Sequence, residues 1–214
     1  MEMDHEARYR VARDSRFDGR LFVGVTTTGL PMSQQQPDKL LLDRVPSPLG
    51  ETLLVTDETG VLRALDFHDY EARMLRLLRL HYGGISLASG PAPKQVRTAL
   101  KCYFEGEISA LEQVAWATAG TEFQRSVWAA LTTISPGKTT TYGSLARQLG
   151  LPNAARAVGL ANGSNPVGVV VPCHRVIGAD GALTGYGGGL HRKKWLLLHE
   201  GVQLEETTTV DLFS

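Results

Sequence analysis

Apolar and β-branched residues come in short runs along the first third of the chain, and turn-forming residues separate one run from the next. Runs of this length and composition are typical of β-strands. Helical spacing follows, with apolar residues recurring at every third or fourth position in two stretches. The pattern predicts strands at 39–45, 52–56 and 61–67, helices at 69–81 and 94–104, and a loop at 86–93.

The second half of the chain is predicted to be mostly helical. Thr121 and Gln124 match a capping box, which starts a helix that Ser135-Pro136-Gly137 stops. A short helix at 142–149 follows, and after a turn Asn153 is in position to cap a further helix. Two helices joined by such a turn form a candidate helix-turn-helix, which binds DNA in some proteins and only packs helices together in others.

These elements divide the chain into four segments. The expected fold class is α/β of the α+β kind, with a small N-terminal domain of a β-sheet plus helices and a mostly helical C-terminal domain that contains the helix-turn-helix. The segments are an N-terminal extension at 1–36, the sheet domain at 37–118, the C-terminal domain at 119–203 and a tail at 204–214.

Charge is unevenly distributed along this chain of 214 residues, whose formal net charge is zero. Residues 121–201 hold eight Lys or Arg and three acids, which favours a modest attraction to phosphates. The N-terminus carries no apolar secretory segment, no apolar run approaches the roughly 20 residues of a membrane span, and two cysteines occur. We expect a soluble protein in a reducing compartment, with free thiols and no membrane contact.

A cysteine and a histidine follow the β-branched run Val169–Val171, which is predicted to be a buried strand. Thiolate is the reactive form of cysteine, and a neighbouring histidine can lower the thiol pKa, so Cys173 beside His174 is a candidate nucleophile. Alternatively, Cys173 is a small buried apolar residue. Adjacent residues of an extended chain point to opposite sides, so proton transfer between them would need a water or a kinked backbone. Glu200 is a candidate carboxylate to orient the imidazole.

The glycine-rich stretch 185–189 is either a flexible turn or one wall of a pocket. It lacks the strand, helix and lysine of a phosphate-binding loop, which argues against nucleoside triphosphates as ligands. Missing side chains would let a planar ligand approach the backbone, and Tyr186 offers a ring for stacking.

Together these residues resemble the O6-alkylguanine-DNA alkyltransferase family over about residues 39–201, most strongly from Thr121 onward. The order and spacing of six motifs carry the resemblance, above all Pro-Cys-His-Arg-Val. The motifs are Phe123–Trp128, Tyr142–Ala146, Ala154–Gly159, Asn162–Pro166, Pro172–Val176 and the stretch from Gly185 to Gly201. The resemblance implies direct, irreversible, single-turnover transfer of an alkyl group from O6-alkylguanine, and from O4-alkylthymine, in double-stranded DNA to a cysteine, without a cofactor.

The resemblance also implies a role for each matching catalytic residue. Cys173 would accept the alkyl group, with His174 as its base through a water and Glu200 orienting His174. Tyr142 would donate a hydrogen bond toward guanine N3 as the base leaves, and Asn165 would brace the turn of the nucleophile. Such a hydrogen bond helps to stabilise the leaving guanine.

The remaining residues implied by the resemblance bind DNA and the flipped base. Small residues of the second helix of the helix-turn-helix would enter the minor groove, and Arg156 would fill the gap that the extruded nucleotide leaves. For Arg156 the alternative is a phosphate contact at the surface or a solvated charge. The full set is Ala154, Ala155, Arg156, Ala157, Gly159, Val176, Tyr186 and Gly187.

Parts of the chain depart from this family, and other functions compete. Residues 8–29 resemble the start of a phosphotriester-repair domain but lack its zinc-binding cysteines, so no metal site is expected. A non-catalytic alkylguanine sensor that recruits other repair factors is the main alternative, and the presence of Cys173 argues against it. A thiol hydrolase would leave Arg156 and Asn165 unexplained, and a transcription regulator would need an operator-binding domain larger than the first segment.

Overall fold

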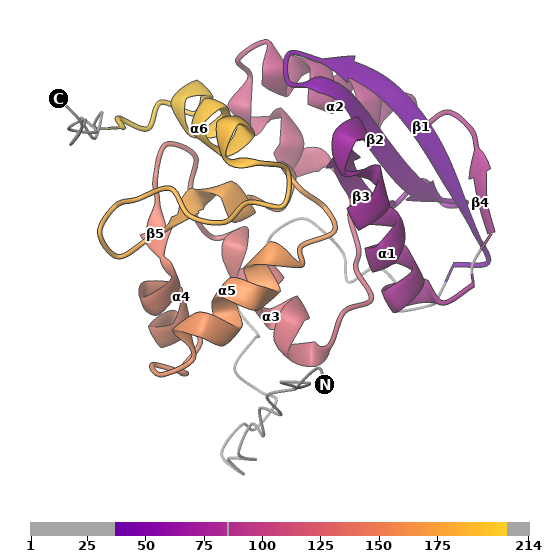
Figure 1. Ribbon diagram of the computed structural model, residues 1–214. Helices are drawn as coiled ribbons and strands as arrows, with labels where there is room; N and C mark the ends of the chain where they lie inside the picture. Colours follow the sequence, from indigo (N-terminus) through magenta and orange to yellow (C-terminus); the bar gives the residue numbers. More distant parts are fainter. Residues whose placement is uncertain (1–36, 85, 205–214) are drawn as a thin grey trace, which may run out of the picture. The chain divides into compact units, whose positions relative to one another are not determined.

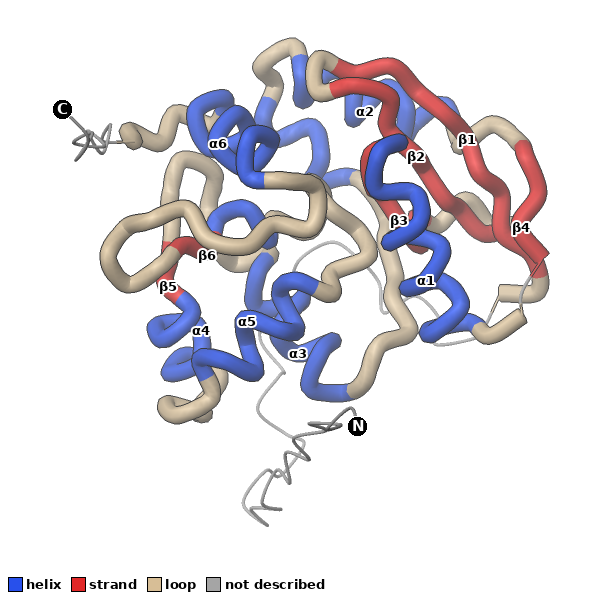
Figure 2. Tube along the Cα trace, in the orientation of Figure 1, coloured by secondary structure: helices blue, strands red, loops and turns tan. Residues whose placement is uncertain are grey.

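The computed structural model describes residues 37–84 and 86–204 (Figures 1 and 2). The proposed extension at 1–36, including the stretch that resembles a phosphotriester-repair domain, lies outside the described residues, as does the tail beyond residue 204.

A four-stranded sheet comes first in the described chain. β1 (Lys39–Ser47), β2 (Gly50–Asp57) and β3 (Leu62–Phe67) form an antiparallel meander, as predicted. β4 (Ser86–Ser89) adds to the free edge of β1 in parallel, so the strand order is β3-β2-β1-β4. The prediction of a loop at 86–93 is therefore wrong for its first four residues. Their short Ser-Leu-Ala-Ser sequence is weak as a strand signal, because the pairing comes from the β1 backbone.

Helices cover both faces of this sheet. The two predicted helices are confirmed as α1 (Glu71–Tyr82) and α2 (Lys94–Phe104). Leu53 and Val55 of β2 pack on the α1 side, whereas Leu54 between them packs on the side of α2 and the C-terminal helices. Burial on both faces explains why β2 is a continuous apolar run instead of an alternating one.

Up to residue 204, where the described chain ends, the C-terminal half contains four α-helices, α3 (Glu122–Leu131), α4 (Tyr142–Gln148), α5 (Ala155–Gly163) and α6 (Leu190–His199). The capping box at the start of α3 is confirmed, because Thr121 Oγ1 accepts a hydrogen bond from the Gln124 N–H at 3.2 Å and the Gln124 side chain accepts one from the Thr121 N–H at 2.9 Å. A two-stranded parallel pair, β5 (Thr140–Thr141) and β6 (Val176–Ile177), lies beside the helices.

The predicted cap of α5 is wrong. Asn153 lies in the turn, and Ala154 occupies the N-cap position without any side-chain hydrogen bond. The Ala154 N–H donates to Leu151 O at 2.9 Å, so the turn closes on Ala154 and the helix starts one residue later than the Asn signal indicates.

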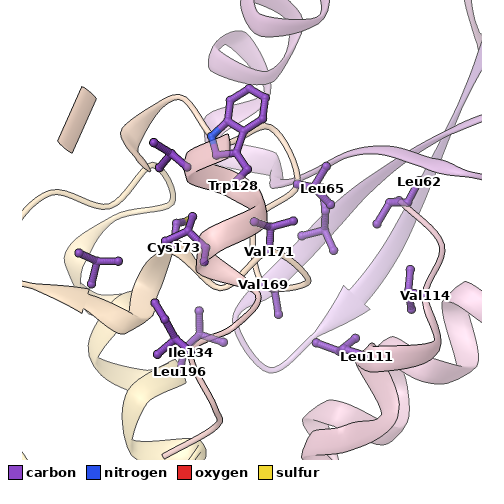
Figure 3. Close-up of a cluster of buried hydrophobic side chains, with 14 of the residues drawn as sticks. Leu62, Leu65, Leu111, Val114, Trp128, Ile134, Val169, Val171, Cys173 and Leu196 are labelled. Atoms are coloured by element: carbon purple, nitrogen blue, oxygen red, sulfur yellow. The ribbon is translucent and has the colours of Figure 1, made fainter. Parts of the chain in front are cut away.

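One hydrophobic cluster runs from the sheet into the helical half (Figure 3). Leu62 and Leu65 of β3 belong to it together with Trp128 of α3, which is fully buried. The Trp128 indole N–H donates to Ala161 O of α5 at 2.8 Å, so the polar atom of this large core residue is satisfied. Since the cluster is continuous, the helical half packs directly on this face of the sheet.

We expect Thr121→Ala to lower the free energy of unfolding by about 1 kcal/mol, because the Gln124 N–H loses its acceptor. Thr121→Ser retains the hydroxyl and should stay within a few tenths of the wild-type value. Urea denaturation measures both changes, and an Ala variant as stable as the wild type would show that the box contributes nothing.

Candidate active site

The segment that leads to Cys173 is a chain of tight turns, and the predicted strand at Val169–Val171 is wrong. Val167 makes an isolated bridge to Leu65 of β3, after which the Val170 N–H donates to Gly168 O at 2.8 Å and the Val171 N–H to Val167 O at 3.0 Å. Val169 adopts a φ of 67°, which a β-branched residue rarely does. The composition favours a strand, but the segment pairs with the sheet at a single position and then turns away.

Two asparagine side chains replace the missing strand hydrogen bonds. Asn165, which is buried, donates from Nδ2 to Val171 O at 2.8 Å and accepts from the Val167 N–H at 3.0 Å. Asn162, on the inner face of α5, donates to Cys173 O at 3.3 Å. Sequence reasoning did not select Asn162, although a polar residue on the buried side of an apolar helix could have indicated it.

Cys173 and His174 lie in a single 3-10 turn, Cys173–Arg175, and both are buried. The premise of an extended chain at this point is therefore wrong. His174 Nε2 lies 3.0 Å from Glu200 Oε1, so the structure brings together the two residues that the sequence suggested. An ionised carboxylate can only accept, so Nε2 carries the proton and Nδ1 is left as the basic nitrogen. Nδ1 is buried without a hydrogen-bond partner among the described residues.

Glu200 is the most highly bonded carboxylate of the site. Arg175 donates to Oε2 at 2.7 Å and to Oε1 at 2.9 Å, and Tyr103 of α2 donates to Oε1 at 2.9 Å. Burial alone would raise the pKa of Glu200, but the hydrogen bonds from His174 and Arg175 outweigh it and lower the pKa to about 2. The carboxylate is thus ionised at neutral pH.

Sequence reasoning missed two of the Glu200 partners. Arg175 is part of the Pro-Cys-His-Arg-Val motif, and a charged residue within an apolar stretch was a usable signal. Tyr103 precedes Glu200 by 97 residues in the chain, and no spacing rule connects them.

Burial governs the protonation of the Cys173 thiol and the His174 imidazole. It raises the pKa of the Cys173 thiol, against which a hydrogen bond with Asn165 and the charges of Arg73 and Lys193 act in the opposite direction. It also lowers the pKa of His174 despite the neighbouring Glu200. The resting site therefore holds a neutral thiol and a neutral imidazole, which is the protonation state that general-base activation of a nucleophile requires.

The glycine-rich stretch forms one side of the site. The Tyr186 ring lies edge-on to the His174 ring, with 6.4 Å between centroids. A Cβ on Gly187 would lie 2.5 Å from Cζ of Arg73, so a side chain at this position would displace the Arg73 guanidinium. Arg192 of α6 fixes the stretch to the sheet domain, because it donates to Gly188 O and to both carboxylate oxygens of Asp69 at 2.8–2.9 Å.

Arg73 on α1 connects the sheet to the end of the DNA-recognition candidate α5. It donates to Asp66 of β3 at 2.6 Å, to Gly163 O at 2.7 Å and to Asn165 O at 3.0 Å. Carbonyls at the C-terminus of a helix lack intrahelical donors and favour a nearby cation. Arg73 therefore caps α5 from another part of the chain.

The remaining predicted residues lie on α4, α5 and β6. Tyr142 at the start of α4 has its hydroxyl 3.4 Å from Thr184 O, and its ring lies 3.7 Å from where a Cβ on Gly159 would be. Val176 is buried, and its carbonyl accepts from Lys193 Nζ at 2.6 Å. On α5 and its N-cap, the structure exposes Arg156 and Ala157 and leaves Ala154, Ala155 and Gly159 half-buried.

Residues 37–84 and 86–204 contain neither a candidate metal site nor a helix that could span a membrane. No group of three or more His, Cys, Asp or Glu side chains in this part of the chain could hold a metal ion. No helix in the same ranges has the length and apolar composition that crossing a membrane demands.

Comparison with known proteins gives matches along most of the chain. The model of the 6-O-methylguanine DNA methyltransferase DNA binding domain matches residues 122–202, and that of the ribonuclease-like domain matches residues 43–115. Methylated-DNA-protein-cysteine methyltransferase of Shigella flexneri is 49% identical over 168 residues, which are 78% of this chain and 98% of the relative.

Solved structures agree with the sequence matches. The crystal structure of Mycobacterium tuberculosis O6-methylguanine methyltransferase superposes with a TM-score of 0.63 at 41% identity, over 75% of this chain and 92% of the other. The structure of Mycobacterium tuberculosis OGT in complex with DNA gives the same TM-score, identity and coverage.

The low pKa of Glu200 predicts an acid-dependent contribution to stability. Its folded pKa of about 2 lies below the ordinary value of 4.5, so the ionised carboxylate stabilises the fold above pH 4.5, and this contribution is lost as the pH falls toward 2. The stability advantage of the wild type over Glu200→Gln should therefore shrink by about 3 kcal/mol between pH 6 and pH 2. Chemical denaturation across this range measures the difference, and an advantage that does not change with pH would contradict the assignment.

Proposed function

Because the chain belongs to the 6-O-methylguanine DNA methyltransferase family, we propose that it repairs DNA by moving the alkyl group of O6-alkylguanine onto its own Cys173. The supporting observation is the buried arrangement of Cys173, His174 and Glu200 inside the matched motifs. Each molecule acts once, because the thioether product has no route back to the thiol in this site.

In the proposed mechanism the Cys173 thiol gives its proton to a water molecule, and this water gives a proton to Nδ1 of His174. The thiolate attacks the alkyl carbon, the new S–C bond forms as the C–O6 bond breaks, and the electron pair leaves with guanine. Tyr142 donates a hydrogen bond toward N3 and disperses the negative charge of the leaving base. The base then takes up one proton from solvent, and His174 releases to solvent the proton that came from the thiol. Glu200 keeps the imidazole in the tautomer that leaves Nδ1 free.

DNA binding is assigned to the helix-turn-helix of α4 and α5. Ala157 and the neighbouring small residues let α5 approach the floor of a narrow groove, and the exposed Arg156 occupies the space of the flipped nucleotide. Extrusion is needed because Cys173 is buried and cannot reach a stacked base. The proposal includes Val176, Tyr186 and Gly187 as the walls around guanine.

Further details of the proposal rest on the same resemblance. The protein would also act on O4-alkylthymine, and it would work as a monomer on double-stranded DNA in the bacterial cytoplasm. Its chain would form two domains, at 37–118 and 119–203. The separate matches at 43–115 and 122–202 support the domain boundary.

A sensor without transfer is the second candidate. Recognition alone would not need a basic nitrogen beside a buried thiol, nor an ionised carboxylate to orient it. The network around Glu200 therefore favours transfer.

Intact mass spectrometry tests the function directly. After mixing with excess duplex that contains O6-methylguanine, the protein should gain one methyl group, mapped to Cys173, and Cys173→Ala should gain none. Repair without a mass gain would mean turnover and exclude a stoichiometric acceptor. Binding of the modified duplex with neither repair nor mass gain would support the sensor.

Arg156→Ala separates base flipping from chemistry. Extrusion costs a few kcal/mol, so losing a group that stabilises the extruded state should slow transfer from duplex DNA by at least about tenfold. Transfer from the free base O6-methylguanine needs no extrusion and should keep its wild-type rate. Quenched-flow assays with both substrates measure the two rates, and an equal loss on both would place Arg156 in the chemical step instead.

A further inference from the structure

Tyr103 connects the sheet domain to the catalytic carboxylate. Its side chain is completely buried on α2, and its hydroxyl donates to Glu200 Oε1 at 2.9 Å. The same oxygen lies 3.0 Å from His174 Nε2 and accepts from Arg175 at 2.9 Å. Three donors thus converge on the one oxygen that orients the proposed base.

Tyr103 also contacts the residue before Glu200. Its backbone carbonyl lies 2.6 Å from His199 Nε2, and its ring packs edge-on to the His199 ring at 5.2 Å between centroids. Two consecutive residues at the end of α6 are therefore bonded to the side chain and backbone of one tyrosine. This arrangement fixes where α6 delivers Glu200.

We propose that the Tyr103 hydroxyl is a positioning group for alkyl transfer, which holds Glu200 so that His174 presents Nδ1 to the nucleophile. The inference rests on the proposed transfer to Cys173 and assigns the sheet domain a part in it. The Tyr103 hydroxyl bonds to the carboxylate, so it acts on the transfer through Glu200.

Removing the hydroxyl has a defined electrostatic consequence. Oε1 would accept two hydrogen bonds instead of three, so the carboxylate would become a stronger acceptor for the His174 Nε2–H and would stabilise the imidazolium. The other ionisable groups near the pair are Arg175 on the catalytic turn, Lys193 and His199 on α6, Tyr186 of the glycine-rich stretch, and Cys173, and none of them changes in the variant. The pKa of His174 should therefore rise.

Tyr103→Phe, tested in the full chain, removes only this hydroxyl. We expect single-turnover transfer from O6-methylguanine duplex to slow about tenfold at neutral pH, since a hydrogen bond to a charged group is lost. The midpoint of the acid limb of the pH–rate profile should move to higher pH, by about half a pH unit or more. A merely structural role would lower the fraction of protein that becomes methylated and leave the midpoint of the limb in place.

A matched control and a second variant complete the test. Tyr82→Phe changes a buried tyrosine on α1, which packs with Leu53 and Val55 on the opposite face of the sheet, and should leave both rate and profile unchanged. Should Tyr103→Phe fold poorly, 3-fluorotyrosine at position 103 keeps the hydroxyl and makes it a stronger donor. The midpoint of the acid limb should then move to lower pH.

The outcomes are distinguishable from failure of the proposed function. A wild-type protein that takes up no methyl group would refute the transfer itself. An active wild type whose Tyr103→Phe variant has the same rate and the same acid limb, or whose 3-fluorotyrosine form shows no shift, would refute only the role of Tyr103.

Discussion

The arrangement of the site depends on keeping one carboxylate charged inside the protein. An unpaired buried carboxylate would cost several kcal/mol, and Glu200 avoids this with donors from the catalytic turn and from α2. Each donor fixes a distance between two elements. The requirement for charge compensation therefore sets where α6, the turn of Cys173 and the sheet domain lie relative to one another, before any substrate is present.

A second constraint acts on the backbone next to the nucleophile. The chain between α5 and Cys173 makes a single bridge to β3 and then folds into turns that contain a left-handed valine. Such a conformation is unfavourable and persists only where surrounding contacts determine it. Asn165 supplies two of these contacts, and Arg73 bonds to the Asn165 carbonyl from α1. The nucleophile is thus held by polar groups on one side and by the hydrophobic cluster on the other.

Local rules predicted much of this structure from sequence. The meander, α1, α2 and the capping box of α3 were readable because strand composition, helical periodicity and cap chemistry act within a few residues. The pairing of His174 with Glu200 could be suggested from chemistry and from the family resemblance. What could not be predicted depends on distant partners. β4 pairs with the edge of β1, Asn165 bonds to the backbone on both sides of the left-handed Val169, and Tyr103 reaches Glu200 from α2.

The same long-range contacts affect what a fragment of this chain could do. The two matched regions end and begin within a few residues of each other, at 115 and 122, which invites cutting between them. The helical piece alone would lose Tyr103 from Glu200, Arg73 from the end of α5 and Asp69 from Arg192. It would also expose the apolar surface that now covers β3. The sheet and the helices can therefore be divided in the sequence, but the folded parts depend on each other. A hybrid protein that exchanges one of them has to keep these three contacts or replace them.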